Sequence, residues 1–381
     1  MLRKKICIVA TVPYALNMFM APHIRMLAKT YDVTLITNGQ HSDLDFCIGE
    51  IIHFIPLGIV RKISLLHDVR VLISLCFIFR SQQFDAVHSL TPKMGLLAMV
   101  AACLTRVPRR IHTFTGQVWA NKQGVARWCL KFLDKLTATC ATNLLADSAS
   151  QRQFLLDQSV TTNSKISVLG LGSVCGVDMA RFRPNSIVRH AVRRSMTIAD
   201  DDLVVLFLGR LTKDKGILDL VLAFSALADE IPNLHLLVVG PDESHVESTI
   251  LKILEKHEQR FHRVGFTNVP EEYMACADVI GLPSYREGFG SVIIEAAAVG
   301  IPAVASDIYG LVDAVVDGKT GILHEAKNVS EIRSALVRLL SNAKLRTEMG
   351  NAAQARARAC FDVSTLASEM DTFYKHQVFG M

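Results

Sequence analysis

Residues 278–300 read Asp-Val-Ile-Gly-Leu-Pro-Ser-Tyr-Arg-Glu-Gly-Phe-Gly-Ser-Val-Ile-Ile-Glu-Ala-Ala-Ala-Val-Gly. The apolar start of this stretch, up to Leu282, predicts a short buried strand, and the glycines that follow predict a loop. An alanine-rich helix is expected over 291–299, ended by Gly300. A strand, a glycine loop and a helix in this order present free backbone N–H groups and the positive end of a helix dipole to an anion.

Two carboxylates lie in or beside this loop, and two cations lie in a second loop of the same kind. Glu287 lies in the loop and Glu295 about one turn into the helix, so both can point into one cleft. A second strand–turn–helix pattern occurs earlier, where residues 209–216 read Gly-Arg-Leu-Thr-Lys-Asp-Lys-Gly. Arg210 and Lys215 stand there beside the start of the next helix. A diphosphate needs fixed cations and N–H donors, and the two loops together supply both.

The pattern on both sides of these loops favours an α/β fold, because strands alternate with helices of similar length. Strands are expected at 5–11, 31–37, 84–89, 109–114, 204–208, 234–240, 261–266, 302–307 and 320–324. Residues 51–56 form a further apolar run, and residues 138–147 are expected to hold the end of a helix and a strand. Helices are expected at 15–30, 59–80, 92–105, 217–229, 243–260, 270–276, 329–341, 345–359 and 363–378. The 381 residues suggest two domains, divided in the polar segment 169–185. Ligands of such folds bind at the carboxyl ends of the strands.

The cysteines and the apolar runs indicate the compartment of the protein and its relation to the membrane. The nine cysteines are scattered with no C-x-x-C pair, which is typical of buried thiols in a reducing compartment. The start of the chain resembles a signal peptide, but its apolar run breaks at Pro13, so a first buried strand is favoured. The apolar runs 71–79 and 94–105 are shorter than the roughly 20 residues of a spanning helix.

Charge is distributed unevenly along the chain. Residues 1–170 hold 19 Lys and Arg against 9 Asp and Glu, a net charge of +10, and the remaining 22 and 27 give −5. A basic first half indicates an anionic partner, for which nucleic acid and an anionic membrane leaflet are candidates. Segment 59–80 carries Arg61, Lys62, Arg70 and Arg80 in an apolar background. It is either a helix lying in a membrane interface or a core helix with a basic outer face.

A second basic segment, 122–135, favours the membrane interpretation, because Lys122, Arg127, Lys131 and Lys135 surround Trp128, Phe132 and Leu133. Cofactor motifs are absent from the sequence. It contains no G-x-x-x-x-G-K-[ST] and no G-x-G-x-x-G at the first turn, so ATP and NAD are not expected. Nor does it offer a D-x-D suited to Mn²⁺, since Asp200–Asp202 fall on an expected surface turn.

Several motifs together carry a family resemblance. They are Phe207-Leu-Gly-Arg-Leu-Thr-Lys-Asp-Lys-Gly216, Gly265-Phe266, Ala277-Asp-Val-Ile-Gly-Leu-Pro-Ser284, Glu287-Gly-Phe-Gly with Glu295, Gly300-x-Pro302 and Asp317-Gly-x-x-Gly321. Over about residues 204–361 the chain resembles retaining glycosyltransferases of family 4, which have the GT-B fold. The first half more loosely resembles bacterial members that build O-antigen or capsule, through Asp85-Ala-Val-His88, Thr91-Pro-Lys93, Arg110–Gly116 and Asp147-Ser148.

The resemblance implies two Rossmann-like domains that face a cleft and bind different substrates. Residues 1–170 would form the acceptor-side domain, joined by the C-terminal helix 363–381, and residues 171–362 the nucleotide-sugar domain. The donor-binding residues implied are Gly209, Arg210, Lys215, Glu287, Gly288, Phe289, Gly290, Ser291 and Glu295, of which Arg210, Lys215 and Glu287 would act in catalysis. By analogy, Arg210, Lys215 and the loop N–H groups hold the diphosphate, Glu295 the ribose and Glu287 a sugar hydroxyl.

The acceptor side departs from the family pattern. Ala15-Leu-Asn17-Met occupies the place of a frequent glycine pair, and Thr115-Gly116 the place of a frequent His-Gly. Asn17, Lys93, Thr115 and Gly116 are therefore the acceptor-side candidates. His112 would point away from Thr115 in a strand, so no catalytic role is transferred to it, and it is interpreted as a hydrogen-bonded core or cleft-edge residue.

The leading hypothesis is a retaining hexosyl- or N-acetylhexosaminyltransferase. It would move a sugar from a nucleotide-diphosphate donor, with UDP as the expected carrier, to a lipid-linked saccharide in bacterial surface polysaccharide synthesis, such as lipopolysaccharide. The protein is expected in the cytoplasm, peripheral on the inner face of the membrane, without a cofactor, a metal or nucleic acid. The alternatives are a nucleotide-sugar epimerase of GT-B architecture and a non-catalytic nucleotide-sugar-binding protein. The donor base, sugar, acceptor, linkage and oligomeric state are left open.

Overall fold

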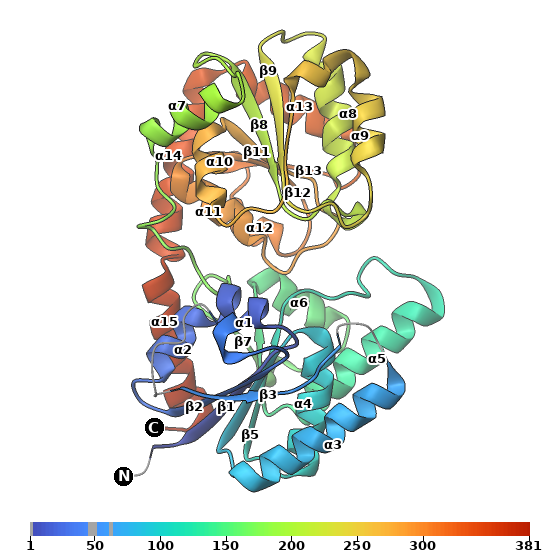
Figure 1. Ribbon diagram of the computed structural model, residues 1–381, viewed down its shortest axis with the longest axis vertical. Coiled ribbons are helices and arrows are strands. Elements are labelled where there is room, and N and C mark those ends of the chain that lie inside the picture. Colours follow the sequence, from blue (N-terminus) through green and yellow to red (C-terminus); the bar gives the residue numbers. More distant parts are fainter. Residues whose placement is uncertain (1–2, 45–51, 61–63) are drawn as a thin grey trace. The chain divides into compact units, whose positions relative to one another are not determined.

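The computed structural model describes residues 3–44, 52–60 and 64–381 (Figure 1). The chain forms two compact units: unit 1 comprises Met1–Cys175 and Val363–Met381, and unit 2 comprises Gly176–Asp362. Each unit is built on one parallel sheet with helices on its faces. The predicted pair of doubly wound domains, and the return of the last helix to the first of them, are confirmed.

The sheet of unit 1 has seven strands in the order β3-β2-β1-β4-β5-β6-β7. These are β1 (Lys5–Val9), β2 (Asp32–Thr37), β3 (Ile52–Pro56), β4 (Ala86–Leu90), β5 (Arg109–Phe114), β6 (Asn143–Ala146) and β7 (Ile166–Val168). The first strand pairs with β2 and β4, so residues 5–9 lie inside the sheet. Because side chains alternate across a strand, Ile6 and Ile8 enter one apolar cluster while Cys7 and Val9 enter another.

Helices flank this sheet. They are α1 (Pro13–Phe19), α2 (Ala21–Leu27), α3 (Leu65–Gln82), α4 (Pro92–Leu104), α5 (Gly124–Cys140), α6 (Ala149–Asp157) and α15 (Val363–Thr372), the last of which packs on α2 and continues as a π-helical segment, Phe373–Val378. The single helix expected over 15–30 is two helices, because Pro22 cannot donate the backbone hydrogen bond that would join them. The prediction also missed α6 and β7.

Helix α3 corrects the expectation for segment 59–80. It begins at Leu65, and residues 61–63, with Arg61 and Lys62, lie outside the described residues. One face buries Val71, Leu75 and Phe79, and α3 packs on α4, which in turn packs on α5 (Figure 1). The opposite face is apolar as well as basic, since it exposes Leu65, Leu66, Val69, Ile73 and Phe77 beside Arg70 and Arg80. Among the described residues, no helix is long and apolar enough to span a bilayer.

Two histidines belong to a buried polar layer in unit 1. His88 contacts the Tyr374 hydroxyl at 2.9 Å through Nδ1 and the Thr113 hydroxyl at 2.7 Å through Nε2. His112 Nδ1 lies 2.9 Å from the Ser89 hydroxyl. Burial lowers the pKa of each imidazole to about 3, so both are neutral at physiological pH. The interpretation of His112 as a hydrogen-bonded core residue is confirmed.

The sheet of unit 2 has six strands in the order β10-β9-β8-β11-β12-β13. These are β8 (Leu203–Leu208), β9 (Leu234–Val239), β10 (Phe261–Val264), β11 (Val279–Leu282), β12 (Ala303–Ser306) and β13 (Gly321–His324). Its helices are α7 (Ser186–Ser195), α8 (Ile217–Ala228), α9 (Glu247–Ile253), α10 (Pro270–Cys276), α11 (Ser291–Val299), α12 (Leu311–Ala314), α13 (Val329–Leu340) and α14 (Ala343–Cys360). One apolar cluster joins this sheet to its helices.

The helix expected over 243–260 is broken, and α7 was not predicted. Asp242 accepts hydrogen bonds from the N–H groups of Ser244, Val246 and Glu247, which holds the chain in a turn until α9 begins. A 3-10 segment, Glu255–Arg260, follows α9. Local side-chain capping has therefore replaced the first turn of the expected helix.

The two ends of unit 2 lie side by side. The Val177 N–H donates to the Phe361 carbonyl at 2.7 Å, and Val177 forms an isolated parallel bridge with Asp362. Unit 2 thus begins and ends at one place, although its terminal residues are far apart in the sequence.

The cysteines are less uniformly buried than expected. Each of the eight in the described residues is a free thiol, but Cys103 and Cys129 are exposed while Cys7, Cys175 and Cys276 are buried. The expectation of buried thiols is therefore wrong for the two exposed ones.

Candidate functional site

The stretch that leads into α11 has the predicted order of strand, glycine loop and helix. Strand β11 ends at Leu282, and α11 covers the predicted residues 291–299. Gly290 precedes the helix with a φ of +77°, and a Cβ there would lie 2.4 Å from Leu311 Cδ2. Both the backbone angle and the packing therefore require glycine. The N–H groups at the start of α11 are available to an anion, as at any helix N-terminus.

Phe289 contributes backbone alone to this loop. Its side chain is buried and packs edge-on against Phe361, with ring centroids 5.3 Å apart. Gly288 is also buried, while Ser291 is half-buried at the first position of α11. The ring of Phe289 thus anchors the loop to the core, and a ligand would meet only its N–H group.

The second predicted loop, residues 209–216, lies next to the first. It follows β8, which pairs directly with β11, so both loops leave the same edge of the sheet. Gly216 has a φ of +65° and caps α8. A Cβ on Gly216 would lie 2.0 Å from the Pro283 carbonyl oxygen. The two loops are therefore in backbone contact, and glycine makes this approach possible.

An ion pair joins the two loops at their centre. Lys215 Nζ lies 2.5 Å from Glu287 Oε1, and the Ser284 hydroxyl donates to the same oxygen at 2.8 Å. The two charged side chains are only 20% and 11% exposed. A cation and a carboxylate that sequence places 72 residues apart thus meet beside the glycine loop.

Further contacts fix the loops around this pair. The Tyr285 N–H donates to the Asp214 carbonyl at 2.8 Å, and the Tyr285 hydroxyl donates to Asp219 at 2.7 Å. Arg286 Nη2 lies 3.2 Å from the Asp214 carboxylate. Because these bonds tie Tyr285 and Arg286 to the 209–216 loop and to the first turn of α8, the positions of Lys215 and Glu287 are set before any ligand arrives.

Arg210 lies further out than Lys215. Its guanidinium is 2.8 Å from the Glu243 carboxylate, and both side chains are more than a third exposed. Gly209, just before it, donates its N–H to the Val239 carbonyl at 2.9 Å and continues the ladder between β8 and β9. Of the two predicted cations, Lys215 is the one held inside the site.

Glu295 is half-buried on α11 and has an altered pKa. Burial raises the pKa of its carboxyl group to about 7, the positive charge of Arg181 lowers it, and the negative charge of Glu271 raises it. Arg181 was not among the predicted site residues. The sequence shows Arg181 only as a basic residue in the polar segment 178–185, and this segment resembles a linker between domains.

The predicted acceptor-side residues all lie in unit 1. Asn17 on α1 donates to the Asp43 carbonyl at 3.0 Å. Lys93, at the start of α4, lies 2.5 Å from Asp68 of α3 and 2.6 Å from the Val60 carbonyl. Thr115 and Gly116 directly follow β5, with Thr115 half-buried and Gly116 at a φ of +101°. Lys93 therefore ties α4 to α3.

Two polar residues near Thr115 were missed. Gln117 and Asp147 follow β5 and β6, which are neighbours in the sheet, and both are buried. Gln151 joins them, since its amide donates to Gln117 at 3.4 Å and accepts the Asp147 N–H at 2.7 Å. Within the described part of the chain, Gln117 Nε2 and Asp147 Oδ1 have no hydrogen-bond partner. Burial raises the pKa of Asp147 well above its ordinary value.

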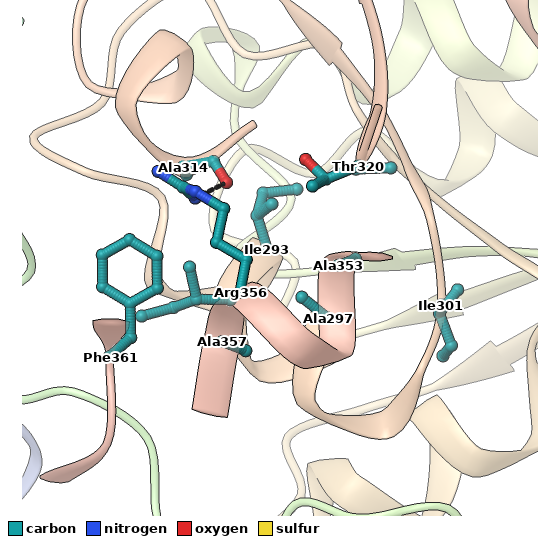
Figure 2. A pocket seen from close by; sticks show the side chains of 11 residues that line it. Ile293, Ala297, Ile301, Ala314, Thr320, Ala353, Arg356, Ala357 and Phe361 are labelled. Atoms are coloured by element: carbon teal, nitrogen blue, oxygen red, sulfur yellow. Dashed lines mark hydrogen bonds between the residues drawn. The ribbon is translucent and has the colours of Figure 1, made fainter. Parts of the chain in front are cut away.

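A small cavity lies behind α11 (Figure 2). Its volume of about 10 Å³ approaches the minimum for one water molecule, so it cannot hold a sugar or a nucleotide. Figure 2 shows the Arg356 side chain extending toward Ala314, whose carbonyl accepts its hydrogen bond at 2.8 Å. Ile293 and Ala297 line this cavity, whereas Glu295 does not, so it is a packing gap in the core of unit 2.

The described residues contain no group of three or more His, Cys, Asp or Glu side chains that could hold a metal ion. Positive charge at the site comes from Lys215, Arg210 and the start of α11. This arrangement can bind a phosphate or diphosphate and, through Glu287 and Glu295, hydroxyl groups.

Comparisons with known proteins agree with this chemistry. The family described as glycosyl transferases group 1 matches residues 188–356, and the glycosyl transferase 4-like domain matches residues 21–172. The capsular polysaccharide biosynthesis glycosyltransferase CapM of Staphylococcus aureus is 28% identical, with 91% of this chain and 90% of that protein covered. The UDP-Gal:alpha-D-GlcNAc-diphosphoundecaprenol alpha-1,3-galactosyltransferase of Escherichia coli is 26% identical, over 82% and 80% of the two chains.

A solved structure shows the same fold over nearly the whole chain. HepE of Anabaena, in complex with UDP and glucose, superposes with a TM-score of 0.81 at 16% identity, covering 98% of this chain and all of that one. The two family matches together span most of both units. The chain therefore belongs to the glycosyltransferases of the GT-B fold and the family 4 type.

Proposed function

We propose that the protein transfers a sugar, with retention of configuration, from a nucleotide-diphosphate sugar to a lipid-linked saccharide in bacterial surface polysaccharide synthesis. The observation that carries the donor assignment is the Lys215–Glu287 pair between two loops in backbone contact. Lys215 can meet a phosphate while Glu287 meets a sugar hydroxyl. A single donor that contains both groups would engage both partners of the pair.

The names of the relatives support the choice of substrates. The Escherichia coli relative is named for UDP-Gal as donor and for a diphosphoundecaprenol-linked acceptor, and the Staphylococcus aureus relative is named for capsular polysaccharide biosynthesis. HepE was solved with UDP and glucose. We therefore assign UDP as the nucleotide, a hexosyl or N-acetylhexosaminyl group as the cargo, and a lipid-diphosphate saccharide as the acceptor.

The chemical demand on the site is to stabilise the leaving nucleoside diphosphate. In the proposed reaction the bond from C1 of the sugar to the phosphate oxygen breaks, and a bond from C1 to the acceptor oxygen forms on the same face. The acceptor hydroxyl gives its proton to the departing phosphate oxygen. Lys215, Arg210 and the N–H groups of Gly290 and Ser291 would stabilise the developing negative charge. Neither a metal nor a dedicated base is needed for this step.

The decisive experiment measures donor binding and transfer separately. UDP-, GDP- and dTDP-sugars are added to the protein, and we expect a UDP-sugar to raise the melting temperature. With a lipid-diphosphate saccharide present, the same donor should yield a glycosylated acceptor, and the activity should persist in EDTA. Turnover of the donor without acceptor would indicate an epimerase. Binding without any turnover would indicate a binding protein, and loss of activity in EDTA restored by Mn²⁺ would indicate a metal site.

We also propose that helices α3 and α5 of unit 1 bind an anionic membrane. Val125, Trp128 and Phe132 are more than half exposed on α5, and the rings of Trp128 and Phe132 stack with centroids 5.7 Å apart. Exposed Lys122 and Lys135 are on or next to the same helix. Aromatic side chains flanked by cations are typical of surfaces that enter the headgroup region of a bilayer.

Helix α5 is anchored to unit 1 by Arg127 and Lys131, the two other basic residues of segment 122–135. Arg127 and Lys131 lie 5.2 and 5.7 Å from the centroid of the Trp119 ring, and both donate to the Gln158 side chain at 3.1 Å. These contacts turn Arg127 and Lys131 toward the rest of unit 1. The residues left for a membrane are therefore the exposed aromatic pair and the outer lysines.

Replacing Trp128 and Phe132 together with serine should weaken binding to phosphatidylglycerol-containing vesicles by about tenfold or more, because each ring buries apolar area in the interface. Vesicle co-sedimentation measures the bound fraction. The control is Ile187→Ser, which removes a still more exposed apolar side chain from unit 2 and should leave vesicle binding unchanged. If the double variant and the parent sediment equally, this surface does not bind the membrane and its role is purely structural.

A further inference from the structure

Two buried polar side chains, Gln117 and Asp147, follow neighbouring strands of the unit 1 sheet. Phe114 is opposite Ala146 in the register of β5 and β6, so Asp147 leaves the sheet opposite Thr115. Gln117 comes two residues after Thr115. The side chain of Gln117 is fully buried, and Asp147 is only 5% exposed. Both residues therefore belong to the carboxyl edge of a parallel sheet, where ligands of such folds bind.

A single side chain, that of Gln151, holds both residues. Its Nε2 donates to Gln117 Oε1 at 3.4 Å, and its Oε1 accepts the Asp147 N–H at 2.7 Å. The Ser148 hydroxyl caps α6 by accepting the Gln151 N–H at 3.1 Å, so the backbone of Gln151 is fixed as well. Because a backbone N–H can bond only to an oxygen, the orientation of both amides follows. Gln151 Nε2 must face the Gln117 oxygen, and Gln117 Nε2 points elsewhere.

The segment that carries Gln117 is anchored by Trp119. The indole Nε1 of Trp119 donates to Asp134 of α5 at 2.7 Å, and its ring stacks on Phe154 of α6 with centroids 5.2 Å apart. The Ala120 N–H donates to the Gln117 carbonyl at 3.1 Å and closes a turn between the two residues. The segment is thus held by both helices that follow β5 and β6. The position of Gln117 is therefore set before any ligand arrives.

This frame leaves one donor and one carboxyl oxygen unpaired. Over the residues that the structure describes, Gln117 Nε2 and Asp147 Oδ1 make no hydrogen bond, although both atoms are buried. Buried polar atoms are nearly always hydrogen-bonded, and leaving one unpaired costs free energy. A position that served packing alone would be filled better by an apolar side chain. The two unpaired atoms therefore indicate a small polar group that binds between β5 and β6.

We propose that Gln117 and Asp147 form a subsite that binds one hydroxyl group of the acceptor saccharide. This inference rests on the proposed function. The donor residues Lys215 and Glu287 belong to unit 2, whereas Asp147 leaves the sheet opposite Thr115, an acceptor-side candidate. The hydroxyl group is therefore assigned to the acceptor.

The chemistry of the pair matches a hydroxyl group. A hydroxyl both accepts and donates, so it can accept from the Gln117 amide and bond to the Asp147 carboxyl group at the same time. The carboxyl group serves in either protonation state, because it accepts when ionised and can donate when protonated. Two fixed partners for one hydroxyl distinguish one position of a sugar ring from another, since a sugar without that hydroxyl leaves both partners unpaired.

The test combines variants of the full chain with acceptors that lack single hydroxyls. The acceptor is the one that the parent uses best among GlcNAc-, Glc- and Gal-diphosphate lipids, together with its monodeoxy analogues. We expect one analogue that still reacts to have a kcat/KM about 10- to 100-fold lower than the complete acceptor, because the buried pair is left without its partner. In Gln117→Met and Asp147→Leu, the complete acceptor should lose a similar factor, and that analogue should react about as well as the complete acceptor. A purely structural effect would lower both rates equally.

Tyr31→Phe is the matched control. Among the described residues of unit 1, the Tyr31 hydroxyl is another buried polar group without a hydrogen bond, but Tyr31 precedes β2 and so lies at the amino edge of the sheet. This variant should keep the parent's preference among the acceptors. The donor KM should be unchanged in every folded variant, because the donor is assigned to unit 2.

Circular dichroism shows which variants are folded. Gln117→Glu keeps the oxygen that Gln151 binds and loses the free amide group, so it should also lose the preference among the acceptors, and it keeps the test decisive if Gln117→Met does not fold. The same ratio of complete to deoxy acceptor in the parent and in all folded variants would overturn the inference alone, and would mean that the pair binds only a structural water. Failure of the parent to transfer a sugar to any lipid-diphosphate saccharide would overturn the proposed function, and this inference with it.

Discussion

Replacing Lys215 with methionine should lower kcat/KM for the donor by about 100- to 1,000-fold, as expected when one fixed donor to a developing negative charge is removed. Lys215 is the cation held between the two loops, 2.5 Å from Glu287, whereas Arg210 is exposed beside Glu243. The measurement is the initial rate of sugar transfer as a function of donor concentration. Arg210→Met serves as the comparison and should show a smaller loss.

The partner of Lys215 makes this experiment more specific. In Lys215→Met the Glu287 carboxylate keeps its hydrogen bond from Ser284 but loses its counter-charge in a largely buried position, so unit 2 should also be less stable. The double variant Lys215→Met with Glu287→Gln removes the unpaired charge and should recover stability without recovering activity. If the single variant keeps the parent kcat/KM, Lys215 does not meet the donor phosphate.

The largest expected effect on stability comes from Gly216→Ala. A Cβ at this position would lie 2.0 Å from the Pro283 carbonyl oxygen, and the φ of +65° is unfavourable for alanine. Strain of the left-handed backbone and overpacking together should destabilise unit 2 by about 2 to 5 kcal/mol. Denaturant unfolding at constant pH measures the difference in the free energy of unfolding.

Gly318→Ala is the matched control for this variant. Gly318 has a φ of +69° in the same unit, but a Cβ there would meet nothing within 4 Å. Its substitution should therefore cost only the backbone strain, about 1 to 2 kcal/mol. If the two alanine variants are equally stable, the close approach of the loops at Pro283 does not exist in solution.

Local sequence signals predicted the fold and the position of the two loops. The bounds of α11 agree with the predicted 291–299, because an alanine-rich run between Gly290 and Gly300 leaves little doubt about where the helix begins and ends. Likewise, continuous apolar strands such as β8 and β9 are typical of sheets covered on both faces. These signals depend on neighbours in the sequence, so they survive without knowledge of tertiary contacts.

What the sequence could not predict depends on residues distant in the chain. Nothing local indicates that Lys215 and Glu287 share a hydrogen bond, or that the ring of Phe289 turns into the core to meet Phe361. The exposed apolar face of α3 was missed for a similar reason, since an apolar residue in a helix does not show which neighbour covers it. The break before α9 arises from the capping bonds of Asp242.

The adjacent ends of unit 2 have a consequence for the architecture of the chain. Since Val177 and Phe361 are hydrogen-bonded, unit 2 is a domain inserted into a discontinuous unit 1, with both connections at one point. A domain inserted in this way can be excised, replaced or circularly permuted without stretching its host, because the distance between its ends is already short. We therefore expect that unit 2, to which the proposed function assigns the donor, can be exchanged between relatives independently of unit 1.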